Sequence, residues 1–153
     1  MEGTLVGAIA LPDGTMVRGR GLGRPVPGGP RPDFGLYLGS ARLRRRHQGA
    51  LDWPHEWITW PDFLLPTDWA LAATRIVGLL DLARAGAAVE VACHGGIGRT
   101  GTVLACLATA TGLPPEEAVT WVRAHHDKRA VETPWQRTWV TWFARHTQSC
   151  QAG

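Results

Sequence analysis

The chain has 153 residues, a length that suits one compact domain around a single core. It is 44% hydrophobic and 19% charged, and no apolar run approaches the ~18 residues of a membrane-spanning helix, so we expect a water-soluble protein with no membrane partner. The net charge of +3 is too small to indicate a nucleic-acid groove by itself, and we expect no nucleic-acid partner either.

The cysteines and the N-terminus indicate a reducing compartment. The three cysteines cannot all pair with one another, and none belongs to the C-x-x-C arrangement typical of metal sites. Glu2 stands near the N-terminus where a signal peptide would carry basic residues, and residues 12–14 (Pro-Asp-Gly) interrupt the apolar stretch before them. We therefore expect a cytoplasmic protein, and we expect it to be a monomer.

The first third of the chain predicts short strands and long turns. Residues 4–18 alternate like a β-hairpin around the turn at residues 12–14. Residues 19–32 are rich in glycine, proline and arginine, which predicts a surface loop that packs no core. Residues 34–38 form the next expected strand, and residues 42–54 fit either a short helix or a loop. Arginines at the start of that segment are expected on a solvated face: Arg42, Arg44, Arg45 and Arg46.

The remainder alternates strands and helices. Residues 56–60 alternate like a short strand, and residues 88–92 read as a buried one. Each of four helices begins or ends at a typical boundary residue: Thr67-Asp68 and Gly86 for the first, Gly112 for the second, Pro114-Pro115 for the third and Thr133-Pro134 for the fourth. Tryptophans of the last two helices recur at helical spacing, which predicts core packing over ligand stacking: Trp121, Trp139 and Trp142.

Residues 93–102 (Cys-His-Gly-Gly-Ile-Gly-Arg-Thr-Gly-Thr) connect the buried strand to the second helix. Glycines in such a loop let backbone N–H groups turn inward around one point, and the helix N-terminus adds its positive end there. Cys93 begins this anion cradle and Arg99 closes it. Because the field that holds a phosphate also stabilises a thiolate, the pattern predicts a cysteine nucleophile that attacks phosphorus.

Two other readings of this loop stay open. The spacing from Cys93 to Arg99 is weak alone, but the strand, the glycines, the hydroxyl of Thr100 and the helix all accompany it. A nucleotide-binding P-loop would end in Gly-Lys-Ser/Thr, and Arg99 stands in place of that lysine. The remaining reading is a tight strand–helix turn with a buried cysteine, for which so many glycines beside an arginine are unusual.

Displacing an alkoxide or phenoxide from phosphorus also needs a proton for the leaving oxygen. A thiolate has no proton to give and arginine does not release one, so a carboxylic acid on another segment is required. Asp62 of the segment Trp60-Pro61-Asp62 follows a predicted strand, and the tryptophan can anchor a mobile loop. Asp68 and Asp52 are weaker candidates, because the first fits a helix cap and the second precedes a Trp-Pro step in the wrong order.

Residues 93–101 resemble the signature loop of the cysteine-based protein tyrosine phosphatases, and residues 60–63 (Trp-Pro-Asp-Phe) resemble their mobile general-acid loop. The order and spacing of the two motifs are similar to those of the small dual-specificity branch of this superfamily, of bacterial type. Residues 37–40 are similar to the N-terminal strand of that branch. The resemblance covers about residues 33–145, and the two motifs together are highly specific.

The resemblance implies an α/β fold with a central, mostly parallel, twisted sheet flanked by helices, here with an N-terminal β-hairpin. It implies a single phosphatase domain over residues 1–153. Within it, residues 1–32 would form the hairpin and the Gly/Pro/Arg-rich loop, and residues 33–147 the catalytic core.

The resemblance also implies the role of each site residue. Cys93 would form a cysteinyl-phosphate, Asp62 would protonate the leaving oxygen and then activate water, and the Thr100 hydroxyl would hydrogen-bond the sulfur. Arg99 would clamp the phosphate oxygens, so no metal or other cofactor is expected. Backbone N–H groups of the loop would bind the substrate phosphate with it: His94, Gly95, Gly96, Ile97 and Gly98.

Two positions depart from the family pattern. Ala92 stands where a loop-ordering histidine is usual, and His94 on the other side of the cysteine is expected to point elsewhere. The water-positioning motif Gln-Thr-x-x-Gln of classical members begins here with Glu132, and Gln136 fits a capping box better than a catalytic role. Of the other cysteines, Cys106 is expected to be a buried apolar residue. Cys150, near the C-terminus, is the candidate for a disulfide with Cys93 under oxidation.

We therefore expect a phosphomonoester hydrolase acting on phosphorylated protein, on phosphotyrosine and also on phosphoserine or phosphothreonine, with an acidic-leaning bell-shaped pH profile. Highly charged phosphoinositides are less expected, since His94 and Ile97 stand where such phosphatases carry lysines. A phosphate-binding pseudophosphatase is the alternative. A third class, an arsenate- or sulfur-handling cysteine enzyme, would not need Asp62.

Overall fold

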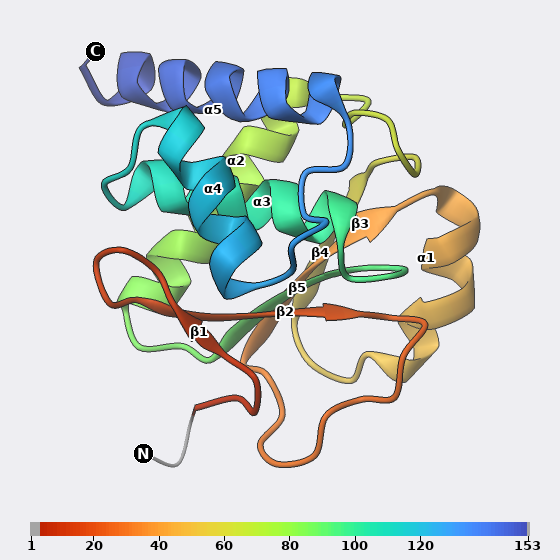
Figure 1. The fold of residues 1–153 in the computed structure, drawn as a ribbon. Helices are drawn as coiled ribbons and strands as arrows, with labels where there is room; N and C mark the ends of the chain where they lie inside the picture. Colours follow the sequence, from red (N-terminus) through yellow and green to blue (C-terminus); the bar gives the residue numbers. More distant parts are fainter. Residues whose placement is uncertain (1–3, 153) are drawn as a thin grey trace.

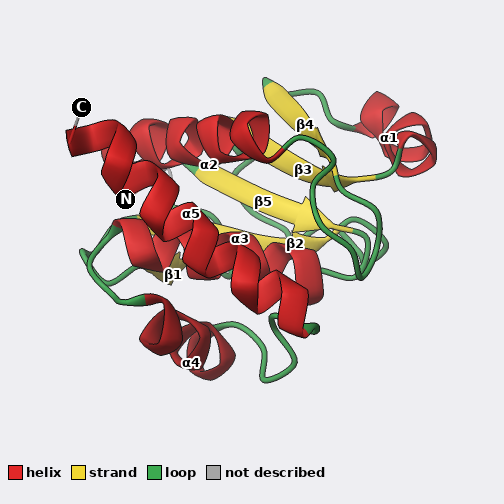
Figure 2. Ribbon diagram, turned by 90° about the horizontal axis from the view of Figure 1, so that it is seen from above, coloured by secondary structure: helices red, strands yellow, loops and turns green. Residues whose placement is uncertain are grey.

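The computed structural model describes the backbone of residues 4–152 and the side chains of residues 4–149. A five-stranded sheet has the order β1-β2-β5-β3-β4 (Figure 2), and its strands are β1 (Ile9–Ala10), β2 (Met16–Gly21), β3 (Phe34–Gly39), β4 (His55–Thr59) and β5 (Val89–Cys93). All neighbours pair in parallel except β1, which is antiparallel to β2. The carboxyl ends of the four parallel strands therefore meet at one edge, where α/β sheets bind ligands.

Helices cover both faces of the sheet. The helices are α1 (Ala41–His47), α2 (Trp69–Arg84), α3 (Gly98–Ala110), α4 (Pro115–His125) and α5 (Pro134–Ala152), and a 3-10 turn (Gln48–Ala50) follows α1. In Figure 1 the helices α2 to α5 lie above β2 and β5, and α1 lies at the right of the sheet. Side chains alternate along β3, so that Leu36 and Leu38 pack under the long helices while Tyr37 packs on the opposite face.

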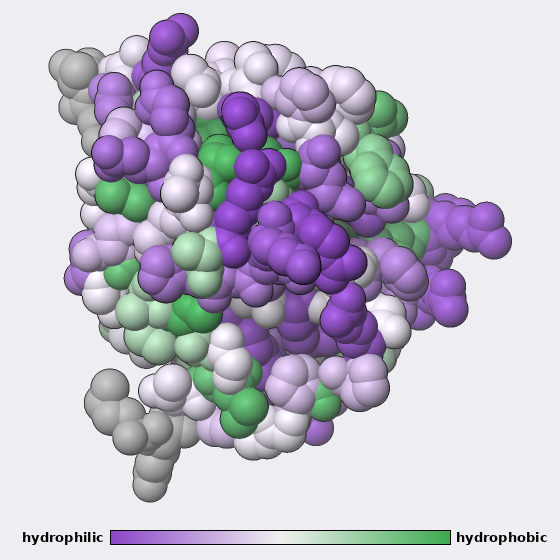
Figure 3. All heavy atoms as spheres, in the orientation of Figure 1, coloured by the Kyte–Doolittle hydropathy of each residue, from purple (hydrophilic) through white to green (hydrophobic). Residues whose placement is uncertain are grey.

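The expected fold class is confirmed, since a mostly parallel sheet flanked by helices carries an N-terminal hairpin. The first strand is shorter than expected, because the chain turns at Gly7 before it. The undecided segment after β3 is a short helix, and its four arginines are exposed as predicted. Figure 3 shows strongly hydrophilic side chains projecting where Figure 1 places α1.

The tryptophans on the last two helices pack as expected. Trp139 is fully buried, and Trp121 and Trp142 are partly buried against the same core. Among the described residues, no helix is both long and apolar enough to span a bilayer.

The prediction of a surface loop over residues 19–32 is wrong at its beginning. Residues 16–21 form β2, which pairs in parallel with β5 beside the signature loop. Glycines at 19 and 21 look like turn residues in the sequence, yet both lie in the strand where other groups approach it closely. A Cβ on Gly21 would lie 2.8 Å from the Gly95 backbone.

A buried charged network fixes β2 to β5 on the face away from the long helices. Glu90 of β5 is fully buried and accepts hydrogen bonds from Arg18 (2.6 Å) and Arg20 (2.9 Å) on β2. Its second oxygen accepts the Tyr37 hydroxyl at 2.7 Å, and that hydroxyl accepts the Trp53 indole N–H at 2.6 Å. Burial alone would raise the pKa of Glu90, but the hydrogen bonds from Arg20, Tyr37 and Arg18 outweigh it and lower that pKa.

Candidate active site

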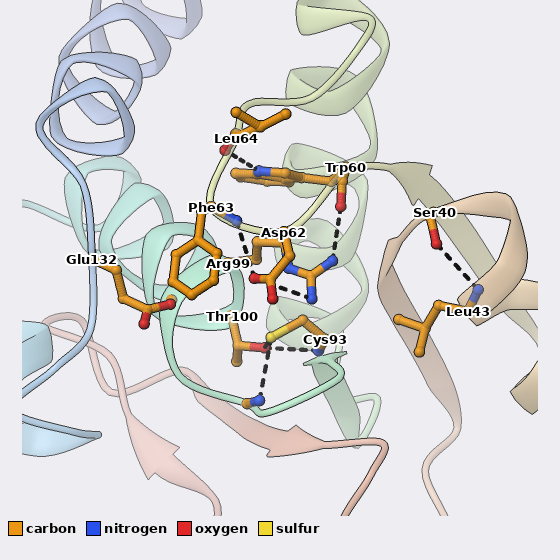
Figure 4. A network of polar contacts seen from close by, with 12 residues as sticks. Ser40, Leu43, Trp60, Asp62, Phe63, Leu64, Cys93, Arg99, Thr100 and Glu132 are labelled. Atoms are coloured by element: carbon orange, nitrogen blue, oxygen red, sulfur yellow. Dashed lines mark hydrogen bonds and ion pairs between the residues drawn. The ribbon is translucent and has the colours of Figure 1, made fainter.

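The floor of the site is the loop between β5 and α3 (Figure 4). Cys93 ends the strand and is 2% exposed. Gly96 has φ of +77°, and a Cβ there would lie 2.6 Å from the Arg20 carbonyl carbon, so the turn requires glycine. This conformation lets the Gly96 N–H donate to Cys93 Sγ at 3.2 Å, so at least this amide of the loop faces the sulfur.

Thr100, in the first turn of α3, is bonded to the same cysteine twice. Its hydroxyl oxygen accepts the Cys93 backbone N–H at 2.9 Å and its O–H donates to Sγ at 3.1 Å. The sulfur thus accepts two hydrogen bonds at the N-terminus of a helix. Hydrogen-bond donors and a helix N-terminus around the sulfur are typical of nucleophilic cysteines.

Arg99 lies beside the sulfur and is 5% exposed. Its Nη1 donates to the Trp60 carbonyl at 2.8 Å, and its Nη2 lies 3.5 Å from Asp62 Oδ1. Within the described residues, the buried Nε has no hydrogen-bond partner. A buried guanidinium with an unused donor beside a glycine-rich helix N-terminus can hold an oxyanion.

The segment after β4 brings Asp62 over this floor (Figure 4). The Trp60 indole is fully buried and its N–H donates to the Leu64 carbonyl at 2.8 Å, which closes the turn. Phe63 has φ of +60°, an uncommon conformation for a bulky residue, and its N–H donates to Asp62 Oδ1 at 3.0 Å. The Trp135 indole N–H of α5 donates to the Phe63 carbonyl at 2.5 Å. A helix that is distant in the sequence therefore holds residues 60–64, which carry Asp62 and are called the acid segment below.

Glu132 brings a second carboxyl to the site. Its Oε1 lies so close to Gly98 that a Cβ there would fall 1.8 Å away. The preceding residue, Val131, has φ of +59°, a strained conformation for a β-branched side chain. Partial burial of the carboxyl raises the pKa of Glu132, and the nearby Asp62 carboxylate raises it further.

Gln136 has a capping role, as the sequence predicts. It is fully buried, and its side-chain oxygen accepts the N–H groups of Glu132 (2.9 Å) and Thr133 (3.3 Å). Its own N–H donates to the Thr133 hydroxyl oxygen, which completes the capping box of α5. Glu132 is therefore the member of this motif that faces Asp62 and the loop.

The flanking positions of the cysteine face away from the site. His94 is exposed and lies over Gly23, where a Cβ would be 2.6 Å from its Cε1. Ala92 packs on the opposite face of the sheet with Tyr37 and Trp57. Neither residue provides a side-chain hydrogen bond that orders the loop, among the contacts of the described residues.

The weaker candidates have structural roles. Asp68 caps α2 by accepting the Leu71 N–H at 3.0 Å, and Asp52 forms an exposed ion pair with Arg31. Cys106 is fully buried in the core, and burial raises its pKa well above the ordinary thiol value. The side chain of Cys150 lies outside the described residues.

Sequence reasoning missed two contributors to this site. His126, just after α4, contacts the Gly96 carbonyl at 2.6 Å, and Trp135 reaches the acid segment as described above. Both act on the backbone, so the residue types alone gave no signal. No cluster of three or more potential metal ligands occurs among the residues that the structure describes.

Comparison with solved structures finds the same fold in three other proteins. The structure of Tk-PTP in its active form has a TM-score of 0.63 at 24% identity, covering 74% of this chain and 79% of that one. Kinase-associated phosphatase (KAP), with its catalytic cysteine replaced by serine, has a TM-score of 0.62 at 17% identity, covering 73% and 68%. PTPMT1 has a TM-score of 0.58 at 17% identity, covering 77% and 80%. At these identities the likeness concerns the fold.

Comparison with sequences identifies the family. No curated protein matches the chain significantly. Residues 67–149, more than half of the chain, match the family model described as PTP-SAK, Swiss Army Knife protein, DSP-PTPase phosphatase domain, and the matched range includes Cys93, Arg99 and Thr100. The chain belongs to this DSP-PTPase phosphatase family.

Proposed function

We propose that this protein is a phosphomonoester hydrolase that dephosphorylates phosphotyrosine, and also phosphoserine or phosphothreonine, through a cysteinyl-phosphate intermediate. The observation that carries the proposal is the pair of hydrogen bonds at Cys93 Sγ, from Gly96 N–H and Thr100 O–H, directly below a carboxylate. Such a sulfur is prepared as an anionic nucleophile, and Asp62 is in reach of a leaving group above it.

In the first step the Cys93 thiolate attacks phosphorus, an S–P bond forms and the ester P–O bond breaks. Asp62, in its protonated form, gives its proton to the departing oxygen. Arg99 and the inward N–H groups stabilise the negative charge on the equatorial oxygens. Their stabilisation is strong because the fold already holds these donors in position before the reaction.

In the second step water attacks phosphorus, the S–P bond breaks and phosphate is released. The Asp62 carboxylate takes the proton of the water, which restores the acid for the next cycle. The Thr100 hydroxyl stabilises the sulfur anion as it leaves, since it donates to that sulfur already. The positive charge of Arg99 stays in place throughout.

The rim of the site supports an aryl phosphate as substrate. The apolar residues Phe63, Leu64 and Trp135 are each about half exposed (52%, 52% and 47%) beside the acid segment. Aromatic side chains at this position can pack against the ring of phosphotyrosine. A headgroup with several phosphates would need lysines in the loop to bind them. His94 and Ile97 stand at the positions where those lysines would lie.

The decisive experiment measures phosphate release from para-nitrophenyl phosphate and from a phosphotyrosine peptide. Cys93→Ser should abolish release and retain peptide binding, whereas Cys106→Ala, a change at a buried thiol away from the site, should retain turnover. Peptide binding without release by the wild type would favour the pseudophosphatase reading. Turnover that is independent of Asp62 would favour the arsenate- or sulfur-handling class.

The substrate class needs a second panel. PTPMT1, which shares the fold at 16% identity with a TM-score of 0.56, was solved in complex with PI(5)P. Rates on phosphotyrosine, phosphoserine and phosphoinositide substrates, with Asp62→Ala as the control, should be highest on phosphotyrosine. A preference for the phosphoinositide would overturn the protein-substrate part of the proposal.

A further inference from the structure

The carbonyl groups of the signature loop are held on its outer side by specific donors. The Cys93 and His94 carbonyls accept the N–H groups that follow β2, from Leu22 at 2.8 Å and Gly23 at 2.9 Å. The Gly96 carbonyl accepts a hydrogen bond from a side chain, His126 Nε2, at 2.6 Å. Because a carbonyl oxygen only accepts, Nε2 carries the hydrogen in this contact.

The orientation of this one peptide matters for anion binding. In a trans peptide the C=O and N–H groups point in opposite directions, so an outward Gly96 carbonyl directs the Ile97 N–H inward. Gly96 has φ of +77° and no side chain, so no Cβ restrains the rotation of the peptide that follows it. With the carbonyl turned inward, its negative end would face the sulfur anion and the bound phosphate.

The fold seats His126 for this contact. The backbone N–H of His126 donates to the Val122 carbonyl at 2.9 Å, which continues the last turn of α4. Its ring lies against β2 at Gly19, where a Cβ would come within 3.0 Å of Cε1. His126 also lines a small groove with Arg24 on the outer side of the loop. The ring is thus partly buried and held on two sides.

We infer that His126 is a positioning residue of the phosphate-binding loop, which fixes the Gly96 peptide so that the Ile97 N–H faces the anion. The inference deepens the proposed function, and its binding test does not depend on turnover. The neighbouring histidine offers a matched control, because His125 is exposed and stacks on Trp121, away from the loop.

The test compares His126→Ala, His126→Gln and His125→Ala. Binding of inorganic phosphate is measured by calorimetry, and its competitive inhibition of para-nitrophenyl phosphate hydrolysis by kinetics. We expect His126→Ala to weaken phosphate binding about 10-fold and to lower kcat/KM by a similar factor, as the loss of one buried hydrogen bond predicts. His126→Gln, whose amide N–H can take the place of Nε2, should recover most of the affinity, and His125→Ala should match the wild type.

The outcomes separate this role from general stability. Thermal unfolding identifies a variant whose loss of binding comes only from a loss of folded protein. If His126→Ala does not fold, the phosphate affinity of His126→Gln is compared with that of the wild type instead. Unchanged phosphate affinity in folded His126→Ala overturns the inference, as does a glutamine variant no better than alanine. A wild type that binds phosphate in a His126-dependent way but never releases it from esters would refute the proposed function alone.

Discussion

The Asp62 carboxylate lies 3.5 Å from the Arg99 guanidinium, which joins the segment after β4 to the loop after β5. Arg99 also donates to the Trp60 carbonyl, so one buried cation holds both the acid and the residue that anchors its turn. A bound phosphate would take over part of the Arg99 hydrogen bonding, and Asp62 would then be released toward the leaving oxygen. The acid and the anion clamp that we propose are therefore coupled through these contacts.

Replacing Asp62 with alanine should lower kcat on aryl phosphates by about 10²-fold or more, because the leaving oxygen loses its proton donor. The loss should be larger for alkyl phosphates, whose leaving groups are more basic. Steady-state rates on a series of leaving groups measure this directly. Asp52→Ala is the matched control, since its carboxylate only pairs with Arg31 on the surface. Equal losses in both variants would contradict the assignment.

We expect Trp135 to affect the rate of catalysis by holding the acid segment in place. Trp135→Phe keeps an aromatic ring and removes the indole N–H that holds the Phe63 carbonyl, so the segment carrying Asp62 should open more often. We expect a loss of about 5-fold in kcat, the size of one net hydrogen bond, concentrated on substrates with basic leaving groups. Trp142→Phe on the same helix should have no such leaving-group dependence. Combined with Asp62→Ala, Trp135→Phe should add little.

The two segments proposed to form the site, around Asp62 and Cys93, stand out in the sequence because each depends on a few neighbouring residue types. Glycines, a cysteine and an arginine fall within a few residues of one another and an aspartate follows a strand, and the structure brings the two segments together at Arg99 and Asp62. His126 and Trp135 were not predictable in this way. Each donates to a backbone carbonyl far away in the chain, and only the packing of α4 and α5 brings them there.

Strand β2 shows a second limit of prediction from the sequence. Its alternating arginines and glycines look polar and flexible, so hydrophobic patterning assigns them to a loop. In the fold, Arg18 and Arg20 are buried where both donate hydrogen bonds to the Glu90 carboxylate, and the glycines on the other face let the signature loop approach. Pairing between distant residues, not the local sequence, makes this segment a strand.

Glu132 should reduce stability at neutral pH. Partial burial and the charge of Asp62 raise its pKa above the ordinary 4.5 in the folded protein, so ionisation penalises the folded state. The penalty is absent at a pH below the ordinary value and complete above the raised one. Glu132→Gln should therefore have a higher Tm than the wild type at pH 7 and the same Tm near pH 3.5. Glu117→Gln, in the exposed first turn of α4, should show no gain at either pH.

Glu90 should stabilise the fold with the opposite pH dependence. The folded pKa of Glu90 is lowered, so its contribution is present at any pH above the ordinary value of 4.5 and is lost as the pH falls through the folded value. Glu90→Gln leaves Arg18 and Arg20 buried without a counter-charge, which should destabilise the protein by about 3–5 kcal/mol at pH 7.

Urea unfolding of the Glu90 variant at pH 7 and again below pH 4 measures both parts of this prediction. The difference in the free energy of unfolding between the variant and the wild type should be smaller in acid, because Glu90 of the wild type then becomes protonated as well. Tyr37→Phe removes one hydrogen bond to Glu90 and should lower the free energy of unfolding by about 1–2 kcal/mol. This milder variant tests the same network if Glu90→Gln does not fold. Arg31→Ala breaks an exposed ion pair and should change the unfolding free energy by less than ~1 kcal/mol. A Glu90 variant as stable as Arg31→Ala would mean that β2 is held to β5 by its backbone pairing alone.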